Sequence, residues 1–384
     1  MLSNADIVDL TTFRRHLHRH PEVSGEEVRT AAEIAAALRG LSPARLINGL
    51  GGHGVAAVFE GMAPGPTVLF RAELDALPIR DESGADWASQ IPGKGHQCGH
   101  DGHSAILLGL ARLLSRRAPA RGRAVMLFQP AEEDGSGAAA VIADPRFAEI
   151  RPDWAFALHN MPGYPLGAVV VEPGPANCAS RGLKVTLSGH TSHAATPHLA
   201  LSPAAPLARL IPAVMAAGPG GEDLRPGFRL VTVTHTRMGE PAFGITPGEA
   251  ELWLTLRTLE DADMAALIDE VMGLVEAEAA ATGLRAAFEQ SDVFHACTNE
   301  PEATAHLIAA AKSEGFARAQ SLGPMRASED FGLFGSRAGA KAAMFLLGSG
   351  ENCPPLHNPD YDFPDELIAP GLRVFDRVLR DLLG

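Results

Sequence analysis

The sequence has few cysteines and no long hydrophobic run. Its 384 residues include only four cysteines, which are Cys98, Cys178, Cys297 and Cys353. Four are too few for disulfides to hold together a chain of this length, so we expect thiols in a reducing compartment. No stretch approaches the roughly 18 consecutive apolar residues of a membrane-spanning helix. These absences exclude a disulfide-stapled scaffold and a transmembrane protein.

Basic residues are also scarce. The chain has 32 lysines and arginines against 46 aspartates and glutamates, a net charge of −14. Binding a nucleic-acid backbone requires clustered basic side chains that displace counterions, so we expect no nucleic-acid partner. Residues 1–22 place acids before the first arginines and have no apolar core followed by a cleavage site. This pattern is untypical of a signal peptide, and we expect a cytoplasmic protein.

Short apolar runs alternate with amphipathic segments in the first half of the chain. Residues 67–70, 123–128 and 154–158 are apolar and bounded by turn residues, which is typical of buried strands. Apolar residues at helical spacing occupy 104–115 and, more weakly, 137–143. This order predicts an α/β sheet, in which functional residues gather at the carboxyl ends of the strands.

The pattern changes near residue 180. The expected elements are, in order, a strand at 183–188, a helix at 203–217, strands at 229–237 and 250–257, a helix at 262–282 and a strand at 286–294. That order is the one of a ferredoxin-like α+β unit. The last segment, with a helix at 302–313, a strand at 342–348 and a helix from residue 364, resembles the first. We therefore predict a discontinuous α/β domain of residues 1–179 and 293–384, with a mixed sheet flanked by helices, interrupted by a small domain of residues 180–292.

Residues 95–103 (GHQCGHDGH) concentrate metal-binding side chains, namely His96, Cys98, His100, Asp101 and His103. Imidazole, thiolate and carboxylate groups bind borderline divalent cations, so this density favours a metal site. Five such groups cannot all serve one ion. The alternative is a polar helix N-terminus, in which Asp101 and Ser104 cap the following helix and the histidines are solvated.

Further groups of this kind follow the next predicted strands. Glu132, Glu133 and Asp134 come after the strand at 123–128. Carboxylates held together in a cleft resist ionisation unless a cation lies among them, although an acidic run can also be a solvated turn. His159 ends the strand after that one. A lone histidine there is more often structural, and only the other groups favour a ligand.

Two more positions complete the candidate site. Asp75 lies just beyond the strand at 67–70, where its carboxylate could accept the second N–H of a ligating imidazole. Alternatively, Arg71 and Glu73 beside it form an ordinary ion pair. His357 lies between prolines, which hold a potential ligand stiffly. Taken alone, it would be a loop histidine.

Eight segments together resemble one family, in order and over nearly the whole chain. They are RRHLHRHPE at 14–22, RAELDALP at 71–78, CGHDGH at 98–103, QPAEE at 129–133, LHN at 158–160, GHTSHAATPH at 189–198, SEDF at 328–331 and LHNPDYDF at 356–363. The pattern resembles the amidohydrolase branch of the aminoacylase and carboxypeptidase-like dinuclear metallopeptidases. That branch includes hippurate hydrolases, indole-acetyl amino-acid hydrolases and N-acetyldiaminopimelate deacetylases.

The resemblance implies two divalent metal ions per chain, with manganese or zinc ahead of nickel or cobalt. The implied ligands are Cys98, His100, Glu133, His159 and His357, with Cys98 as the bridge. Glu132 matches the family's general base, and His193 matches a histidine that family members aim at the developing oxyanion, sometimes from the neighbouring subunit. Without the resemblance, His193 is a loop or helix-cap histidine. The implied fold is a catalytic domain with a ferredoxin-like lid that often dimerises, so we expect a homodimer or a higher homo-oligomer.

The sequence departs from the family pattern within the predicted lid. Residues 189–193 (GHTSH) replace a Gly-Lys-Gly-Gly-His or Gly-Arg-Gly-Gly-His stretch, with the loss of a basic residue and two glycines at His190 to Ser192. Gly244 replaces a common asparagine that helps to hold substrate. Both changes leave the predicted metal chemistry intact and alter the expected contacts with substrate.

We therefore predict a metal-dependent amidohydrolase that cleaves an N-acyl group from an amino acid or a similar small amine. A second hypothesis makes Cys98 a nucleophile with a nearby histidine as base. That enzyme would be inhibited by thiol reagents and not by chelators. A third hypothesis is a non-catalytic metal-binding or dimerisation scaffold, whose function would tolerate Glu132→Gln.

Overall fold

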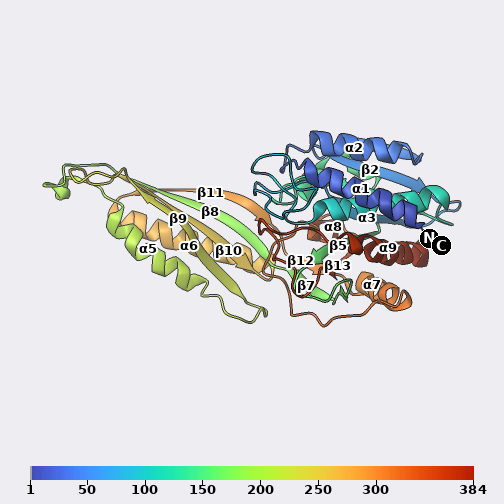
Figure 1. Ribbon diagram of the computed structural model, residues 1–384. Coiled ribbons are helices and arrows are strands. Elements are labelled where there is room, and N and C mark those ends of the chain that lie inside the picture. The colour runs from blue at the N-terminus through green and yellow to red at the C-terminus, as the bar shows by residue number, and fades with distance from the viewer. Residues whose placement is uncertain (1) are drawn as a thin grey trace. The chain divides into compact units, whose positions relative to one another are not determined.

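The chain divides into two compact units (Figure 1). The computed structural model describes residues 2–384. The larger unit contains residues up to Ala176 together with Thr298–Leu322 and Asp330–Gly384. The smaller unit contains Asn177–Cys297 and, from a later part of the chain, Gly323–Glu329. No helix within residues 2–384 is long and apolar enough to cross a membrane.

A seven-stranded mixed sheet forms the centre of the larger unit. Its strand order is β1-β2-β4-β3-β5-β13-β6, in which β3, β4, β5 and β13 are parallel while β2 and β6 are antiparallel to their neighbours. The parallel strands are fully or almost fully buried, as their continuous apolar sequences predict. The strands are β1 (Arg45–Leu50), β2 (Gly54–Glu60), β3 (Thr67–Glu73), β4 (Arg123–Gln129), β5 (Trp154–Met161), β6 (Val169–Val170) and β13 (Lys341–Gly348).

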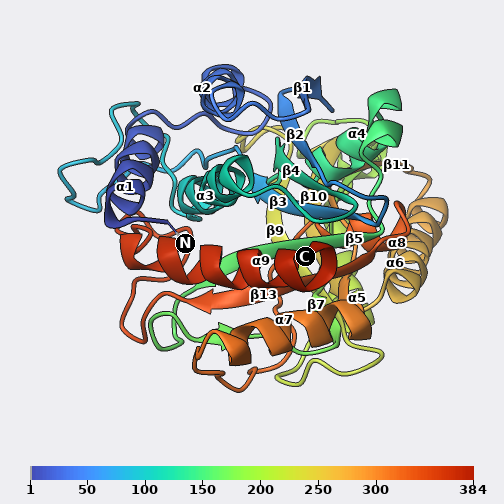
Figure 2. The ribbon, with the colours of Figure 1, turned by 90° about the vertical axis from the view of Figure 1, so that its right-hand side faces the viewer.

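Helices flank this sheet. Five helices (α1, α2, α3, α7 and α9) share one hydrophobic core with it, and α1, α3 and α9 lie side by side (Figure 2). Helices α4 and α8 contact each other and the strands β4 and β13 respectively. The helices are α1 (Asn4–Arg19), α2 (Val28–Arg39), α3 (His100–Arg116), α4 (Gly137–Ala143), η1 (Pro145–Glu149), α7 (Pro301–Ser313), α8 (Gly332–Ser336), η3 (Asp365–Leu367) and α9 (Ile368–Leu383).

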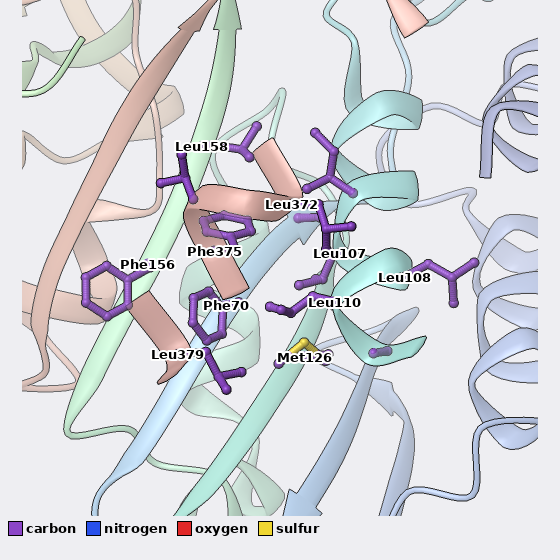
Figure 3. Close-up of a cluster of buried hydrophobic side chains, with 14 of the residues drawn as sticks. Phe70, Leu107, Leu108, Leu110, Met126, Phe156, Leu158, Leu372, Phe375 and Leu379 are labelled. Carbon is purple, nitrogen blue, oxygen red and sulfur yellow. The ribbon is translucent and has the colours of Figure 1, made fainter. Parts of the chain in front are cut away.

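Aromatic side chains join the strands to helix α9 in the core (Figure 3). The ring centroid of Phe70 on β3 lies 5.8 Å from that of Phe156 on β5 and 5.0 Å from that of Phe375 on α9. All three side chains are at most 1% exposed. Because a buried phenylalanine typically contributes about 3 to 5 kcal/mol over alanine, this cluster fixes the strands whose carboxyl ends carry the candidate site.

The smaller unit has the predicted ferredoxin-like order. Its antiparallel sheet has the strand order β11-β8-β10-β9, and α5 and α6 pack on it around one apolar cluster. The elements are β8 (Ala179–Ser188), η2 (Pro197–Leu199), α5 (Ala204–Ala217), β9 (Arg229–Met238), β10 (Glu249–Thr258), α6 (Asp261–Thr282) and β11 (Arg285–Phe294). The chain enters and leaves this unit through β7 (Gly174–Asn177) and β12 (Cys297–Asn299), which pair with each other. The α/β fold with an inserted α+β unit is thus confirmed.

Candidate metal centre

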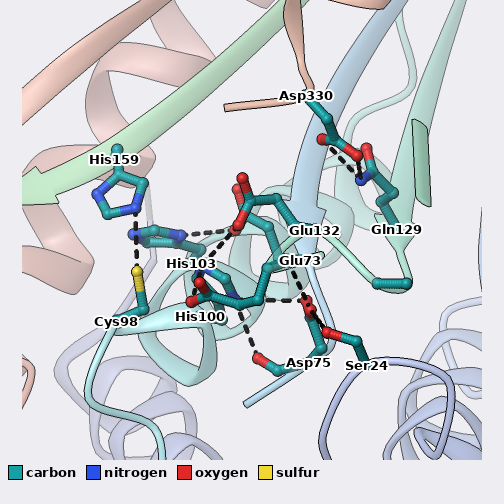
Figure 4. Close-up of polar contacts among 12 residues, drawn as sticks. Ser24, Glu73, Asp75, Cys98, His100, His103, Gln129, Glu132, His159 and Asp330 are labelled. Carbon is teal, nitrogen blue, oxygen red and sulfur yellow. Dashed lines mark hydrogen bonds and ion pairs between the residues drawn. The ribbon is translucent and has the colours of Figure 1, made fainter. Parts of the chain in front are cut away.

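All the predicted site residues except His193 lie in the larger unit. Figure 4 shows five of them: Asp75, Cys98, His100, Glu132 and His159. Three of the parallel strands deliver them at their carboxyl ends: Asp75 just beyond β3, Glu132 and Glu133 after β4, and His159 near the end of β5. Cys98 and His100 lie at the start of α3, and His357 follows β13. Residues that are far apart in the sequence therefore meet at one edge of the sheet, as expected for this topology.

A tight turn brings Cys98 and His100 together. Gly99 between them has φ = 90°, in the left-handed region, and a Cβ atom there would collide with the side chain of Asn160. Glycine is the residue that meets both conditions. Cys98 Sγ lies 3.4 Å from His159 Nε2.

The alternative of a solvated helix N-terminus is wrong. His96, His100 and His103 are each 1% exposed. Asp101 forms a buried ion pair with Arg14 at 2.9 Å instead of capping α3. The hydroxyl of Ser104 donates to a main-chain oxygen of β3. Burial of so many polar groups requires a partner for each, and a cation is one candidate.

Two sets of three potential metal-ligand atoms, called the donor sets below, share Cys98. Donor atoms of Cys98, His100 and His159 lie within 4.8 Å of one another, and so do those of Cys98, Glu133 and His357. Nε2 of His100 has no hydrogen-bond partner within residues 2–384, although it is buried. A buried polar atom without a partner calls for a ligand. The thiol, imidazole and carboxylate set fits borderline divalent cations, and the shared thiol fits two of them.

The charges around His100 also favour a cation at this place. Burial lowers the pKa of His100, but nearby carboxylates outweigh burial and raise the pKa to about 10; they include Glu73, Asp75 and Glu133. Burial raises the pKa of the Cys98 thiol well above its usual value, and Glu133 adds to the rise. The carboxylates thus stabilise positive charge at this place, which a divalent cation would supply in place of a proton.

Asp75 holds two parts of the site. Its main-chain oxygen lies 2.9 Å from His100 Nδ1, and its carboxylate oxygen Oδ1 lies 3.5 Å from the same nitrogen. The nearer acceptor for the imidazole is therefore the main chain. The other carboxylate oxygen, Oδ2, accepts the backbone N–H of Glu133 at 2.9 Å and the hydroxyl of Ser24 at 2.7 Å.

The ion pair between Arg71 and Glu73 is present, and it is buried. Arg71 also contacts Asp330 at 2.6 Å, and Glu73 contacts His103 Nδ1 at 2.6 Å. Gln129 donates to both oxygens of Asp330. This network is packed around the donor sets. Asp330 and Gln129 were not predicted as site residues, although they lie in the quoted motifs SEDF and QPAEE.

His193 lies in the smaller unit and is exposed. Its Nδ1 accepts the backbone N–H of Ala195 at 3.0 Å, and its main chain forms a β-bridge with Ile245. The smaller unit also contains a pocket of about 600 Å³, whose lining includes His190, Thr191, Ile245 and Glu249. Two residues of the sequence departure at His190 to Ser192 therefore line this pocket.

Fold and donor sets define a class of protein. A parallel core of strands that presents two overlapping sets of metal-binding side chains beside a buried carboxylate is the architecture of a metal-dependent hydrolase. The sequence model of the family described as Peptidase family M20/M25/M40 matches residues 69–381. The chain belongs to this family.

Relatives cover nearly the whole chain. It is 29% identical over 370 residues to the N-acetyldiaminopimelate deacetylase of Exiguobacterium sibiricum, with 96% of this chain and 98% of the relative covered. It is 29% identical over 371 residues to the N-acetylcysteine deacetylase of Bacillus subtilis, with 95% and 94% covered. The crystal structure of Bacillus subtilis YxeP, a dinuclear metal-binding peptidase of the M20 family, has a TM-score of 0.84 at 25% identity, with 100% and 99% covered. The chain is accordingly a metal-dependent hydrolase of linear amides.

Proposed function

We propose that this enzyme hydrolyses the amide bond of an N-acyl amino acid, or of a similar small N-acyl amine, with two divalent cations. The observation that carries the proposal is the pair of donor sets that share Cys98. In this proposal Cys98, His100 and His159 would hold one ion, and Cys98, Glu133 and His357 would hold the other. Manganese or zinc is the proposed metal, with nickel or cobalt as alternatives. The names of the deacetylase relatives support the substrate class.

Glu132 is the proposed general base and acid. When bound, divalent cations supply Lewis acidity and make a water molecule acidic near neutral pH. Glu132 is 5% exposed, and its Oε2 lies 3.8 Å from Nε2 of His100. Its carboxylate can accept the proton of the attacking water at the edge of the donor sets and then deliver that proton to the leaving amine. Asp75 orients His100 and fixes the backbone of Glu133.

His193 is the proposed oxyanion donor. Because its Nδ1 accepts a backbone N–H, the proton of the neutral ring resides on Nε2, which is then a donor. A neutral donor aimed at a developing oxyanion contributes roughly 3 kcal/mol to transition-state stability. We propose that the smaller unit acts as a lid that supplies this group, from the same chain or from a partner.

The proposed assembly and location are those expected from the sequence. We propose a homodimer or higher homo-oligomer through the smaller unit, in the cytoplasm, with no nucleic-acid or membrane partner. Strand β9 is a suitable surface for the proposed interface, because it is an edge strand of the sheet and its last residues are exposed. An open edge of this kind is a common pairing surface.

The cysteine nucleophile remains the rival mechanism. Cys98 Sγ lies 3.4 Å from a ring nitrogen of His159, which is the contact that a thiol and a base would make. The two mechanisms differ in what inhibits them. Chelators should abolish metal-dependent hydrolysis, whereas thiol alkylation of the metal-free enzyme should abolish the cysteine mechanism.

The test is a panel of N-acyl amino acids that vary in acyl group and amine. Metal-loaded protein should release free amino acid from at least one of them, and metal-stripped protein should not. Glu132→Gln is the matched control, because it should bind metal and release amino acid about 10²-fold or more slowly than the wild type. Full metal occupancy without hydrolysis of any panel member would favour a scaffold. Hydrolysis by the stripped protein that alkylation abolishes would favour the nucleophile.

A further inference from the structure

The turn that carries Glu132 has an unusual backbone. Ala131, directly before Glu132, has φ = 50°, in the left-handed region that non-glycine residues rarely adopt. Such a conformation costs about 1 to 3 kcal/mol and persists only when the surroundings hold it. The turn is closed on one side by hydrogen bonds from Gly135 to the oxygen of Glu132 and from Gly137 to the oxygen of Ala131. Those bonds leave the N–H of Ala131 to be held by another group.

That group is the carboxylate of Glu27. Glu27 is fully buried, and its Oε1 accepts the N–H of Ala131 at 2.8 Å, across 104 residues of sequence. A side-chain carboxyl oxygen can accept a hydrogen bond from a backbone N–H. Glu27 therefore fixes the residue that sets the direction in which Glu132 leaves the backbone.

Glu27 is available for this contact because another residue caps its helix. Glu27 occupies the N-cap position of α2, where an acidic side chain ordinarily accepts from the first turn. In the described chain its side chain makes no such bond. Glu22 accepts the N–H groups of Arg29 at 3.2 Å and Thr30 at 2.7 Å instead. A capping role consequently does not explain why a carboxylate is buried at Glu27.

The other side of Glu132 is held in a parallel way. Asp75 accepts the N–H of Glu133, and Ser24 donates to the same carboxylate oxygen (Figure 4). The two residues that flank Glu132 are therefore each fixed by a buried carboxylate. Both contacts depend on the segment between Glu22 and Glu27, since Ala76 next to Asp75 donates its N–H to the oxygen of Glu22.

We propose that Glu27 is a positioning residue for catalysis: it holds Ala131 in the left-handed conformation and thereby directs the Glu132 carboxylate toward the donor sets. The proposal rests on the proposed function in one respect, which is the role of Glu132 as the base. Glu27 itself touches neither substrate nor metal in this account. Its effect on the reaction passes through Glu132.

Kinetics of Glu27→Met and Glu27→Gln test this role. Methionine keeps the length and removes the acceptor, whereas glutamine keeps an acceptor oxygen. Glu27→Met should lower kcat by about 10²-fold, the size expected for a misplaced catalytic group, with little change in KM. Glu27→Gln should recover most of that loss. Glu26→Met is the matched control, because the neighbouring Glu26 side chain is 60% exposed and should leave kcat unchanged.

Two double variants separate positioning from a general loss of structure. In a Glu132→Gln background, Glu27→Met should lower the residual kcat no further, because residues that act as one unit are not additive. In an Ala131→Gly background, Glu27→Met should cost less activity than in the wild type, since glycine adopts positive φ without a holding contact. An undiminished loss in both backgrounds would overturn the proposal.

Hydrogen exchange of the metal-free protein gives a readout that does not depend on activity. In Glu27→Met the backbone amides of residues 131–137 should exchange faster than in the wild type, while those of α3 keep their protection. Unchanged exchange in the turn would show that Glu27 does not hold it. Faster exchange with unchanged kcat would show that the held turn does not position the base. If Glu132→Gln alone keeps full kcat, Glu132 is not the base. The exchange result would then still show whether Glu27 holds the turn.

Discussion

Replacing His18 by glutamine should remove a pH-dependent part of the protein's stability. His18 is fully buried on α1, with Nδ1 2.8 Å from Asp101 and Nε2 3.1 Å from Asp81. Burial lowers the pKa of His18, but these carboxylates, Asp101 first, outweigh it and raise the pKa to about 9. The folded protein therefore holds this histidine as a cation well above the pH at which the unfolded chain releases the proton.

The sign and size follow from linkage. Because the pKa rises from an ordinary value of 6.5 to about 9 on folding, the stabilisation is fully present below pH 6.5 and is lost as the pH rises through 9. At about 1.4 kcal/mol per pKa unit, the change amounts to roughly 3 kcal/mol. Glutamine carries no titrating group, so the variant lacks this contribution at every pH.

Denaturant unfolding of the wild type and His18→Gln at several pH values measures the effect. The difference in free energy of unfolding should be largest near neutral pH or below and should shrink by roughly 3 kcal/mol toward high pH. His16→Gln is the matched control on the same helix, because the His16 side chain is 44% exposed. A difference between wild type and His18→Gln that stays constant across this range would refute the assignment of a buried cation at His18.

The remaining predictions concern the site itself. Cys98→Ala and His100→Ala should each remove most of the metal, and full occupancy in the double variant by elemental analysis would end the metal assignment. Glu132→Gln should keep the metal and lower kcat by about 10²-fold or more, whereas Glu133→Gln should lose metal first; reversed behaviour would exchange their roles. His193→Ala should lower kcat strongly at unchanged metal content. If His193 acts from the partner, an excess of inactive Glu132→Gln subunits mixed with inactive His193→Ala subunits should recover some activity, and no recovery despite proven subunit exchange would exclude the partner.

Local patterns predicted much of the fold. The strands β3, β4 and β5 were recognisable because each is a short continuous apolar run, and α4 was predicted to the residue. Strand β1 was not predicted, because its burial repeats every third residue instead of every second, and it contains an Asn-Gly pair that is typical of a turn. The last helix begins at Ile368 and not at residue 364, since a short 3-10 helix precedes it.

In the candidate site, the predicted residues are those with chemically related neighbours in the sequence, and the missed residues have their partners far away in the chain. Cys98, His100 and the acids after β4 were predicted because chemically matched residues are adjacent in the sequence. Glu27 was missed, since an acid near the start of a helix suggests a cap, and its partner Ala131 is 104 residues away. Asp330 was likewise quoted only within a motif, because its contacts with Arg71 and Gln129 span more than 200 residues. Long-range pairing leaves no local pattern to detect.

Metal titration of the stripped protein tests the central claim most directly. Divalent manganese or zinc is added stepwise while the release of free amino acid from an N-acyl amino acid is followed. The account predicts no activity without metal, activity that saturates near two ions per chain, and a Glu132→Gln variant that binds the same two ions with kcat lowered by about 10²-fold or more. Full activity in the stripped protein, insensitive to chelators, would contradict it.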